Sequence, residues 1–295
     1  MAASAAPATS VMRLLDLAGR SAVVSGSSGG IGGAVARALA LQGCRVFGLD
    51  SAAPPPPPLP PLPPPPLTPP PPPAAASVVA AASTSSALSA SAPASASVQH
   101  VPCDLRDPEG AERALRGLGL AQLDFLVNVA GVDPKFSLAE GGPREWAGVH
   151  DLNLRGMYLR TRAAAPLLAR GAGRSVVNVS SINTNLGVRR RSIYSASKAG
   201  VVGLTTGLAR ELGDERIRIN CVSPGWVMTP AQLREYGFGE PRGREVEAYL
   251  DGVQSLAGKR IAPDEVAGVV LFLLSAASGA VTGTNITCDA GWRLQ

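Results

Sequence analysis

The segment from residue 21 to residue 43 constrains the fold more than any other part of the chain. Residues 21–26, SAVVSG, are a short apolar run typical of a buried strand, and residues 34–43, AVARALALQG, have the composition of a helix. Gly26, at the end of the first run, is followed by Gly30 and Gly32, which gives the spacing G-x-x-x-G-x-G. A strand, a glycine turn and a helix in this order are typical of a dinucleotide-binding unit, because the backbone can approach a pyrophosphate and the helix N-terminus attracts its charge.

Strand-like and helix-like segments alternate along the rest of the chain. The expected strands are residues 21–26, 44–49, 98–105, 124–128, 175–179, 216–222 and 285–289, and the expected helices are residues 34–43, 107–119, 143–170, 194–213 and 264–275. Such alternation produces a parallel sheet with helices on both faces. We therefore expect an α/β fold, a doubly wound parallel sheet of the Rossmann type, in a single domain over residues 16–295.

A proline-rich segment interrupts this pattern. Residues 54–73 contain 16 of the 27 prolines, and an Ala/Ser-rich tract continues to Ser97. A proline run can form neither a helix nor a central strand, so polyproline II is expected. We interpret residues 52–97 as a low-complexity surface insertion that replaces the helix between the second and third strands. A passive insert is favoured, and a proline-recognition partner docking on residues 54–73 is the alternative.

The N-terminus suggests no membrane attachment. Residues 1–15 are rich in Ala and Ser and lack the long apolar region of a secretory signal. We interpret them as a tail and expect a cytoplasmic protein, with organellar import as the alternative. No apolar run reaches the ~18 residues that a membrane-spanning helix requires, so no membrane association is expected.

The charged residues and cysteines exclude several kinds of site. The net charge is +5, and the arginines are scattered apart from Arg189, Arg190 and Arg191, which is not the basic stripe of a nucleic-acid-binding surface. The arginine trio could meet an anionic substrate, but a solvated loop is the favoured interpretation. The four cysteines lie far apart without a C-x-x-C, so we expect buried free thiols and no metal.

An acid at the end of the second strand predicts the cofactor. Asp50 follows Gly26 by 24 residues, where a carboxylate accepts hydrogen bonds from the adenosine ribose hydroxyls. It would repel a 2′-phosphate, and none of the positions 27, 28, 51 and 52 is basic. The sequence therefore favours NAD over NADP; a solvated acid at a strand end is the alternative.

A tyrosine and a lysine provide a candidate acid/base pair. Tyr194 and Lys198 are four residues apart at the start of a helix-like segment, so their side chains share one face. A free tyrosine has a pKa near 10, and a neighbouring ammonium would lower that pKa by favouring the phenolate. Ser181 follows an apolar strand and could place a reacting hydroxyl or carbonyl beside the tyrosine. Asn153 lies in the middle of a long helix, where asparagine is slightly unfavourable, so it faces solvent or belongs to a site.

Taken together, the motifs resemble those of short-chain dehydrogenases/reductases over about residues 16–293, apart from the insertion. The motifs are GSSGGIG at 26–32, Asp104 after the third strand, NVAG at 128–131, Asn153, Ser181, YSASK at 194–198 and SPGWVMT at 223–229. The resemblance implies a catalytic tetrad of Asn153, Ser181, Tyr194 and Lys198, in which Tyr194 exchanges a proton with the substrate oxygen, Ser181 orients it, and Asn153 holds a water that links Lys198 to solvent. The spacing of 13 residues before the tyrosine selects Ser181 over Ser180.

The same resemblance implies which residues line a nicotinamide cofactor. They are Gly26, Ser28, Gly30, Ile31, Gly32, Asp50, Asp104, Leu105, Asn128, Ala130, Gly131, Tyr194, Lys198, Pro224, Gly225, Val227 and Thr229. Two positions depart from the family pattern, since Ser25 replaces the usual Thr before the first glycine and Val129 replaces the second Asn of NNAG. We expect both changes to be tolerated.

Three functions are compatible with these motifs. The first is an NAD-dependent dehydrogenase that interconverts a secondary alcohol, in a polyol, sugar or sugar acid, and a ketone, with the polar residues 231–262 as a mobile lid. The second is a 3-oxoacyl-thioester reductase using NADPH, against which Asp50 argues. The third is a non-enzymatic scaffold displaying the proline arm, which would not need the tetrad. A stripe of small residues, Ala196, Gly200, Gly203 and Gly207, allows a close helix approach, and the expected assembly is a homodimer or homotetramer.

Overall fold

The computed structural model describes residues 14–51, 97–241, 243–256 and 258–294. Within them, seven parallel strands form one sheet in the order β3-β2-β1-β4-β5-β6-β7. The strands are β1 (Ser21–Ser25), β2 (Arg45–Asp50), β3 (Val98–Pro102), β4 (Phe125–Asn128), β5 (Ser175–Val179), β6 (Arg218–Pro224) and β7 (Asn285–Cys288). This is the doubly wound arrangement, so the predicted fold class is confirmed.

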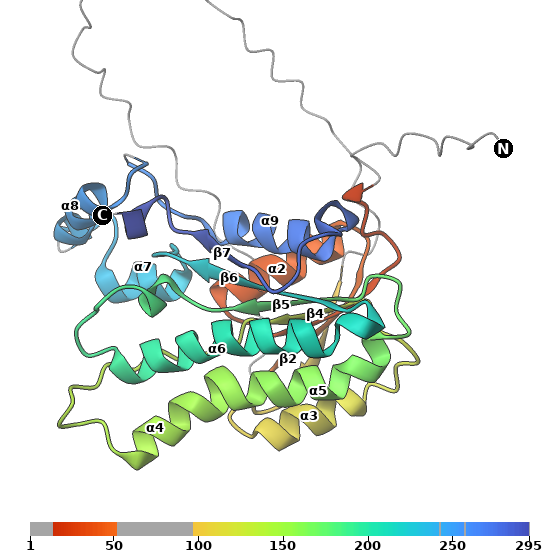
Figure 1. The fold of residues 1–295 in the computed structure, drawn as a ribbon. Coiled ribbons are helices and arrows are strands. Elements are labelled where there is room, and N and C mark those ends of the chain that lie inside the picture. Colours follow the sequence, from red (N-terminus) through yellow and green to blue (C-terminus); the bar gives the residue numbers. More distant parts are fainter. Residues whose placement is uncertain (1–13, 52–96, 242, 257, 295) are drawn as a thin grey trace, which may run out of the picture.

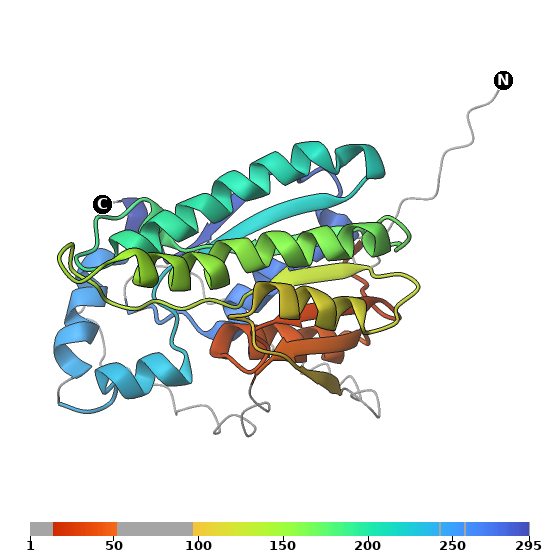
Figure 2. The ribbon, with the colours of Figure 1, turned by 90° about the horizontal axis from the view of Figure 1, so that it is seen from below.

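Helices cover both faces of the sheet (Figures 1 and 2). They are α2 (Gly30–Leu41), α3 (Pro108–Arg116), α4 (Pro143–His150), α5 (Gly156–Leu168), α6 (Ser192–Glu211), α7 (Pro230–Tyr236), α8 (Gly243–Val253) and α9 (Pro263–Leu274). Helices α2 and α9 pack on each other over one face, and α3, α5 and α6 cover the opposite face. The central strands are buried on both faces by these helices: all four residues of β4 and all five of β5 are buried.

The proline-rich insertion and most of the N-terminal tail lie outside the described residues, which begin at residue 14 and omit 52–96. On either side of the insertion the sheet is regular. Val46 of β2 pairs with Val98 of β3, and the parallel register continues to Asp50 and Pro102. The two strands therefore pair as they would in an uninterrupted domain.

The long helix predicted over residues 143–170 is interrupted by a π-helical turn. α4 ends at His150, the π-helical segment η1 (Asp151–Arg155) follows, and α5 begins at Gly156. π-helical turns are rare and occur mostly at functional sites. This one contains Asn153, whose side chain is fully buried and hence does not face solvent.

Two other expectations are refined by the structure. The lid region of residues 231–262 is largely helical, comprising α8 and almost all of α7. In the small-residue stripe of α6, a Cβ on Gly200 would lie 2.8 Å from Leu154 Cδ2, whereas Gly203 and Gly207 have no atom of the described residues within 4 Å of such a position. Of these three glycines, only Gly200 thus packs closely against another segment of the described chain, and the homo-oligomer stays a prediction.

Two of the four thiols are buried, as expected, and two are not. All four cysteines are free, with Cys44 and Cys221 buried and Cys103 and Cys288 partly buried. Among the helices of the described residues, none is both long and apolar enough to cross a bilayer.

Candidate active site

Two adjoining pockets open at the carboxyl ends of the strands. Adjacent strands β1 and β4 are followed by α2 and α4, and the crevice beside such a reversal of strand order is where ligands bind in open α/β sheets. One pocket, of about 330 Å³, lies at the glycine turn, and the other, of about 450 Å³, contains Tyr194. They share Ile31, Val129, Gly131 and Thr229, so they are two parts of one groove.

The glycine turn forms the floor of the first pocket. Gly26 has a φ of +72°, which favours glycine, and a Cβ there would lie 2.9 Å from Ala130 Cα. A Cβ on Gly32 would collide with the Gly26 carbonyl. The bare backbone and the start of α2 at Gly30 leave a flat, donor-rich surface, which fits the pyrophosphate of a dinucleotide.

Asp50 closes the outer end of this pocket. Its Oδ2 accepts a hydrogen bond from Ser28 N at 2.9 Å, and its Oδ1 accepts one from Ser51 N at 2.8 Å. The carboxylate therefore joins the end of β2 to the glycine turn. Asp104 and Leu105, which were predicted to line the cofactor, line the same pocket together with Arg106, which was not predicted.

The two departures from the family motif meet at the end of β4. Ser25 Oγ accepts hydrogen bonds from Val129 N at 3.2 Å and Ala130 N at 3.4 Å. The serine hydroxyl thus ties β1 to the segment after β4. Val129 lines both pockets, and its tolerance stays a prediction.

Asn128, which was expected to line the cofactor, lies beneath the groove. Its side chain is buried in β4, where Nδ2 donates to Asn178 Oδ1 at 3.0 Å and Oδ1 accepts from Arg160 Nε at 3.1 Å. It lines neither pocket. The structure therefore gives this asparagine a role in joining β4 to β5 and α5, beneath the groove rather than in it.

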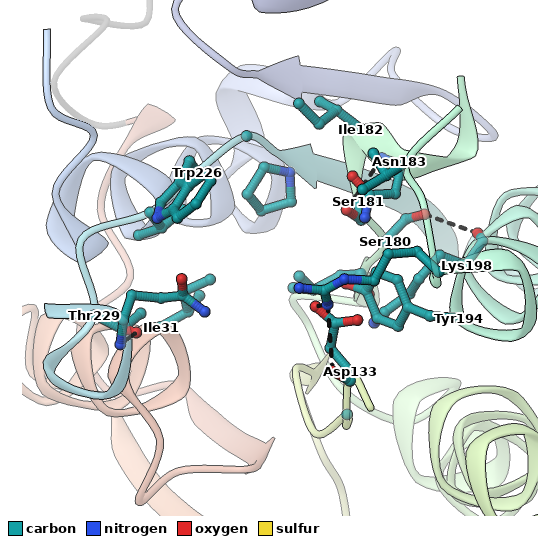
Figure 3. Close-up of a pocket in the computed structure, with 18 of the residues that line it drawn as sticks. Ile31, Asp133, Ser180, Ser181, Ile182, Asn183, Tyr194, Lys198, Trp226 and Thr229 are labelled. Atoms are coloured by element: carbon teal, nitrogen blue, oxygen red, sulfur yellow. Dashed lines mark hydrogen bonds and ion pairs between the residues drawn. The ribbon is translucent and has the colours of Figure 1, made fainter. Parts of the chain in front are cut away.

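Ser181, Tyr194 and Lys198 converge on the second pocket (Figure 3). Ser181 is among the groups that lower the pKa of Tyr194, so its side chain lies beside the phenol. Ser180 Oγ instead donates to the backbone carbonyl of Lys198 at 2.8 Å, so Ser181 is the serine that faces the tyrosine. Lys198 lies one helical turn further along α6, with its Nζ 5.9 Å from the Tyr194 ring centroid.

Burial shifts the pKa values of both titratable groups, but in opposite directions. It raises the pKa of Tyr194 above its ordinary value, while the nearby Ser181 hydroxyl and the Arg191 charge lower it. Burial lowers the pKa of Lys198 to about 8, and its Nζ donates to the Val179 carbonyl at 2.8 Å. Arg191 is thus a cation that lowers the pKa of the phenol, and the lowering by Lys198 that the spacing suggested stays a prediction.

Asn153 is held beside the lysine by the π-helical turn. A Cβ placed on Gly131 would lie 3.1 Å from Asn153 Oδ1 and 3.3 Å from Lys198 Nζ, so the two polar groups meet over this glycine. Asn153 Nδ2 also donates to Ser197 Oγ at 3.0 Å. These contacts fix the amide next to Lys198, and the bridging water stays a prediction.

Most of the predicted site residues come together in the groove. The first pocket holds Gly26, Gly30, Ile31, Gly32, Asp50, Asp104, Leu105, Ala130, Gly131 and Thr229. The second holds Ile31, Gly131, Ser181, Tyr194, Lys198, Pro224, Gly225, Val227 and Thr229. Ser28, Asn128 and Asn153 line neither pocket; Ser28 and Asn153 reach the site through hydrogen bonds to Asp50 and to the backbone after β4. In the described part of the chain, no cluster of three or more His, Cys, Asp or Glu residues could hold a metal.

Sequence reasoning missed an aromatic wall in the second pocket. Trp226 and Trp292 are stacked with ring centroids 6.3 Å apart, and the Tyr249 ring meets Trp292 edge-on at 5.8 Å. Tyr236 packs against Trp226 at 4.8 Å. The four residues come from distant segments, and only Trp226, within SPGWVMT, had a motif to mark it. Across the pocket from Trp226 lie Ser181 and Tyr194 (Figure 3).

Sequence reasoning also missed the ion pairs at the rim. Arg191 pairs with Asp133, and both line the second pocket. Lys135 Nζ lies 2.5 Å from Glu235 Oε1 and donates to Tyr236 Oη at 3.0 Å, so it ties the loop after β4 to α7. The pocket is thereby bounded by the loop after β4, the loop before α6, and the lid helices.

Known proteins with a similar sequence or fold include several dehydrogenases. Residues 74–293 match a family model described as enoyl-(acyl carrier protein) reductase. D-xylose 1-dehydrogenase of Caulobacter vibrioides is 34% identical over 279 residues, covering 94% of this chain and 97% of the relative. Ligand-free aldohexose dehydrogenase of Thermoplasma acidophilum has the same fold, with a TM-score of 0.76 at 24% identity over 95% of this chain and 96% of that one.

A second solved structure contains a cofactor. A putative 2-deoxy-D-gluconate 3-dehydrogenase from Agrobacterium tumefaciens with bound NADP has a TM-score of 0.71 and 26% identity, covering 95% of this chain and 99% of that chain. A nicotinamide cofactor is thus supported for the groove described above. The chain therefore belongs to the short-chain dehydrogenase/reductase family of NAD(P)-dependent oxidoreductases, and several of its relatives are named as dehydrogenases of sugars or polyols, which act on CH–OH groups.

Proposed function

We propose that the protein interconverts a secondary alcohol, such as a CH–OH group of a sugar or polyol, and the corresponding carbonyl, with NAD as cofactor and Tyr194 as the general acid/base. The observation that carries the proposal is that the Ser181 and Tyr194 side chains lie together in the second pocket, which shares Ile31, Val129, Gly131 and Thr229 with the glycine-turn pocket. A proton-transfer group must be within hydrogen-bond reach of the reacting oxygen, and this is the point of the groove where a substrate oxygen can meet both hydroxyls.

In the oxidation direction, Tyr194 Oη accepts the proton of the substrate hydroxyl, and the Ser181 hydroxyl orients the same oxygen. When bound, the nicotinamide supplies the acceptor for the hydride that leaves the substrate carbon. Lys198 and Asn153 lie behind the tyrosine, and the buried ammonium, whose pKa is about 8, can pass a proton onward to solvent. In reduction, Tyr194 returns the proton to the carbonyl oxygen.

The preference for NAD rests on Asp50. Its carboxylate lies at the outer end of the first pocket, held by Ser28 N and Ser51 N. A ribose with free hydroxyls can donate to this carboxylate, whereas a 2′-phosphate would meet a like charge. The structural neighbour with bound NADP makes this preference a matter for direct measurement.

The experiment is a substrate panel followed by the absorbance of NADH or NADPH. It contains simple secondary alcohols, polyols, neutral sugars including D-xylose, sugar acids, and a 3-oxoacyl thioester assayed with NADPH. We expect NAD-dependent oxidation of a sugar or polyol, and a 10²–10⁴-fold lower kcat in Tyr194→Phe, the range that general acid–base catalysis contributes. NAD binding, measured by fluorescence titration, should survive in this variant.

Two results would refute the proposal. Normal turnover by Tyr194→Phe would remove the phenol from the proton transfer, and thioester reduction with NADPH as the main activity would replace the alcohol dehydrogenase. Ser180→Ala is the matched control for Ser181→Ala, since the two residues are neighbours, Ser180 Oγ is bound to the Lys198 carbonyl, and only Ser181 is among the groups acting on the Tyr194 pKa.

A further inference from the structure

Of the three consecutive arginines before α6, only Arg191 points into the pocket. Its side chain is 12% exposed and lines the cavity beside Tyr194. Arg190 lies outside the cavity, pairs with Glu140 at 2.7 Å, and is 49% exposed. The expectation of a solvated basic loop thus holds for Arg190 but is wrong for Arg191.

Asp133 neutralises the charge of Arg191 inside the cavity. The carboxylate pairs with the guanidinium, and the Asp133 backbone carbonyl accepts a hydrogen bond from Arg191 Nη1 at 3.3 Å. The other cation lining the second pocket among the described residues is Lys198, whose Nζ is bound to the Val179 carbonyl. A carboxylate-bearing ligand would therefore approach Asp133 and find no unpaired guanidinium.

The ion pair still offers hydrogen bonds to a neutral ligand. A guanidinium has five N–H donors and a carboxylate about four acceptor positions, so a pair joined through one edge keeps free groups of both kinds. One substrate hydroxyl can donate to Asp133 while a neighbouring one accepts from Arg191. Adjacent hydroxyls on a sugar or polyol ring present this combination.

The opposite wall of the pocket supplies the apolar surface that such a ring needs. Although aromatic residues make up only 4% of the chain, five of its seven Trp and Tyr residues line this cavity. They are Tyr194, Trp226, Tyr236, Tyr249 and Trp292. Large flat side chains pack against the C–H face of a ring and provide much of the binding energy of a pocket with few polar groups. Trp226 stands across the cavity from Asp133 and Tyr194 (Figure 3).

We propose that the Asp133–Arg191 pair and the tryptophan wall make this pocket selective for neutral cyclic sugars or polyols with adjacent hydroxyls, and that Asp133 excludes sugar acids. The proposal rests on the dehydrogenase function proposed above and names the substrate class of the same site. It assigns Asp133 and Arg191 as specificity-determining residues that contact the substrate.

The test compares Asp133→Asn with Glu140→Gln. Both variants remove the charge of a carboxylate on the loop after β4 that pairs with an arginine of the same trio, but only Asp133 lines the cavity. For each protein, KM is measured for D-xylose and D-glucose, and the competitive inhibition constant is measured for D-xylonate and D-gluconate. Asp133→Asn should raise KM for the sugars and lower the inhibition constant for the acids, so that their ratio changes at least tenfold. Glu140→Gln should leave both constants unchanged.

The proposal is overturned if the wild-type protein binds the acids more tightly than the sugars, or if Asp133→Asn changes the ratio no more than Glu140→Gln does. Should Asp133→Asn fail to fold, Arg191→Gln replaces it. That variant keeps the carboxylate, so it should raise KM for the sugars at least tenfold while still rejecting the acids; an unchanged KM contradicts the role of Arg191. If the wild-type protein oxidises no alcohol at all, the proposed function has failed instead.

A third variant isolates the aromatic wall. Trp292→Ala should raise KM for the neutral sugars about tenfold or more, with a smaller change in kcat, because the wall binds the ring without touching the reacting atoms. Trp146→Ala is the control, since Trp146 stacks on His150 in α4 away from the cavity. Equal KM values in the two variants would show that the wall does not contact the substrate.

Discussion

The side-chain amide of Asn153 forms two hydrogen bonds with the backbone of one residue, Val132. Its Oδ1 accepts a hydrogen bond from Val132 N at 2.8 Å, and its Nδ2 donates to the Val132 carbonyl at 3.0 Å. The π-helical turn Asp151–Arg155 therefore holds the segment after β4 at a fixed position over the lysine. Fixing the loop is a structural task that Asn153 performs in addition to its predicted part in proton transfer.

Asn153→Ala should lower the free energy of unfolding by about 1–3 kcal/mol, because it leaves backbone polar groups of a partly buried residue without partners. Denaturant unfolding measures the loss. Ser197→Ala is the matched variant, since it removes the third partner of the amide and leaves both Val132 bonds in place. If Asn153→Ala lost no more stability than Ser197→Ala, the clamp on Val132 would contribute nothing.

Replacing Asp50 should change the preference between NAD and NADP. Asp50→Ala should raise the affinity for NADP relative to NAD at least tenfold, since removing the carboxylate removes a like charge beside the 2′-phosphate, which is worth one to several kcal/mol at close range. Dissociation constants for the two oxidised cofactors measure the ratio. Asp50→Asn keeps an acceptor for Ser28 N and removes only the charge, so it separates repulsion from distortion of the turn. A ratio that stays the same in both variants would contradict the proposed basis of NAD preference.

The fold and most of the groove followed from the sequence because each rests on local chemistry. Short apolar runs bounded by turn residues are typical of buried strands, and the turn needs glycine, as the collision of a Gly32 Cβ with the Gly26 carbonyl illustrates. Ser181, Tyr194 and Lys198 come from one stretch of 18 residues, so their spacing already fixed their proximity.

The residues that were missed or misplaced depend on packing between distant segments. Arg160 resembles a surface arginine in sequence, yet it is fully buried, and its Nε donates to Asn128 Oδ1 at 3.1 Å. This contact keeps Asn128 out of the groove. The aromatic wall needs Trp226 of the segment after β6 to meet Trp292 near the C-terminus, and no periodicity or local pattern reports such a meeting.

Arg191 predicts a change in the pH dependence of alcohol oxidation. Oxidation needs the phenolate form of Tyr194, so the rate rises with pH through the tyrosine pKa. The Arg191 charge lowers that pKa. Arg191→Gln removes this positive charge and leaves the Asp133 carboxylate without its partner, and both changes raise the pKa of Tyr194. The acid limb of the kcat/KM profile should therefore move to higher pH, with lower activity at pH 7.

Arg190→Gln is the control for this profile, because Arg190 belongs to the same loop and is not among the groups acting on Tyr194. Its acid limb should coincide with that of the wild-type protein. Identical profiles for the two variants would remove Arg191 from the electrostatics of the acid/base group.

The lowered pKa of Lys198 makes the stability of the protein depend on pH. Burial lowers the pKa of its ammonium from 10.5 to about 8 in the folded protein, so between these two values the unfolded chain binds more protons than the folded one. Stability then rises with pH across this window, because the cost of burying the charge disappears as the folded protein releases the proton. By this linkage the rise amounts to about 2 kcal/mol between pH 7.5 and 9.5.

Lys198→Met tests this dependence, since it keeps most of the side-chain volume and has no proton to release. The free energy of unfolding, measured with denaturant at pH 7.5 and 9.5 without cofactor, should increase by about 2 kcal/mol more in the wild-type protein than in the variant. The other titrating groups, including the buried Cys221 thiol with its pKa raised to about 11, are present in both proteins and largely cancel in the comparison. If the stability of both proteins responds to pH equally, the Lys198 ammonium is hydrated in the folded protein. The inference that burial lowers its pKa would then be wrong.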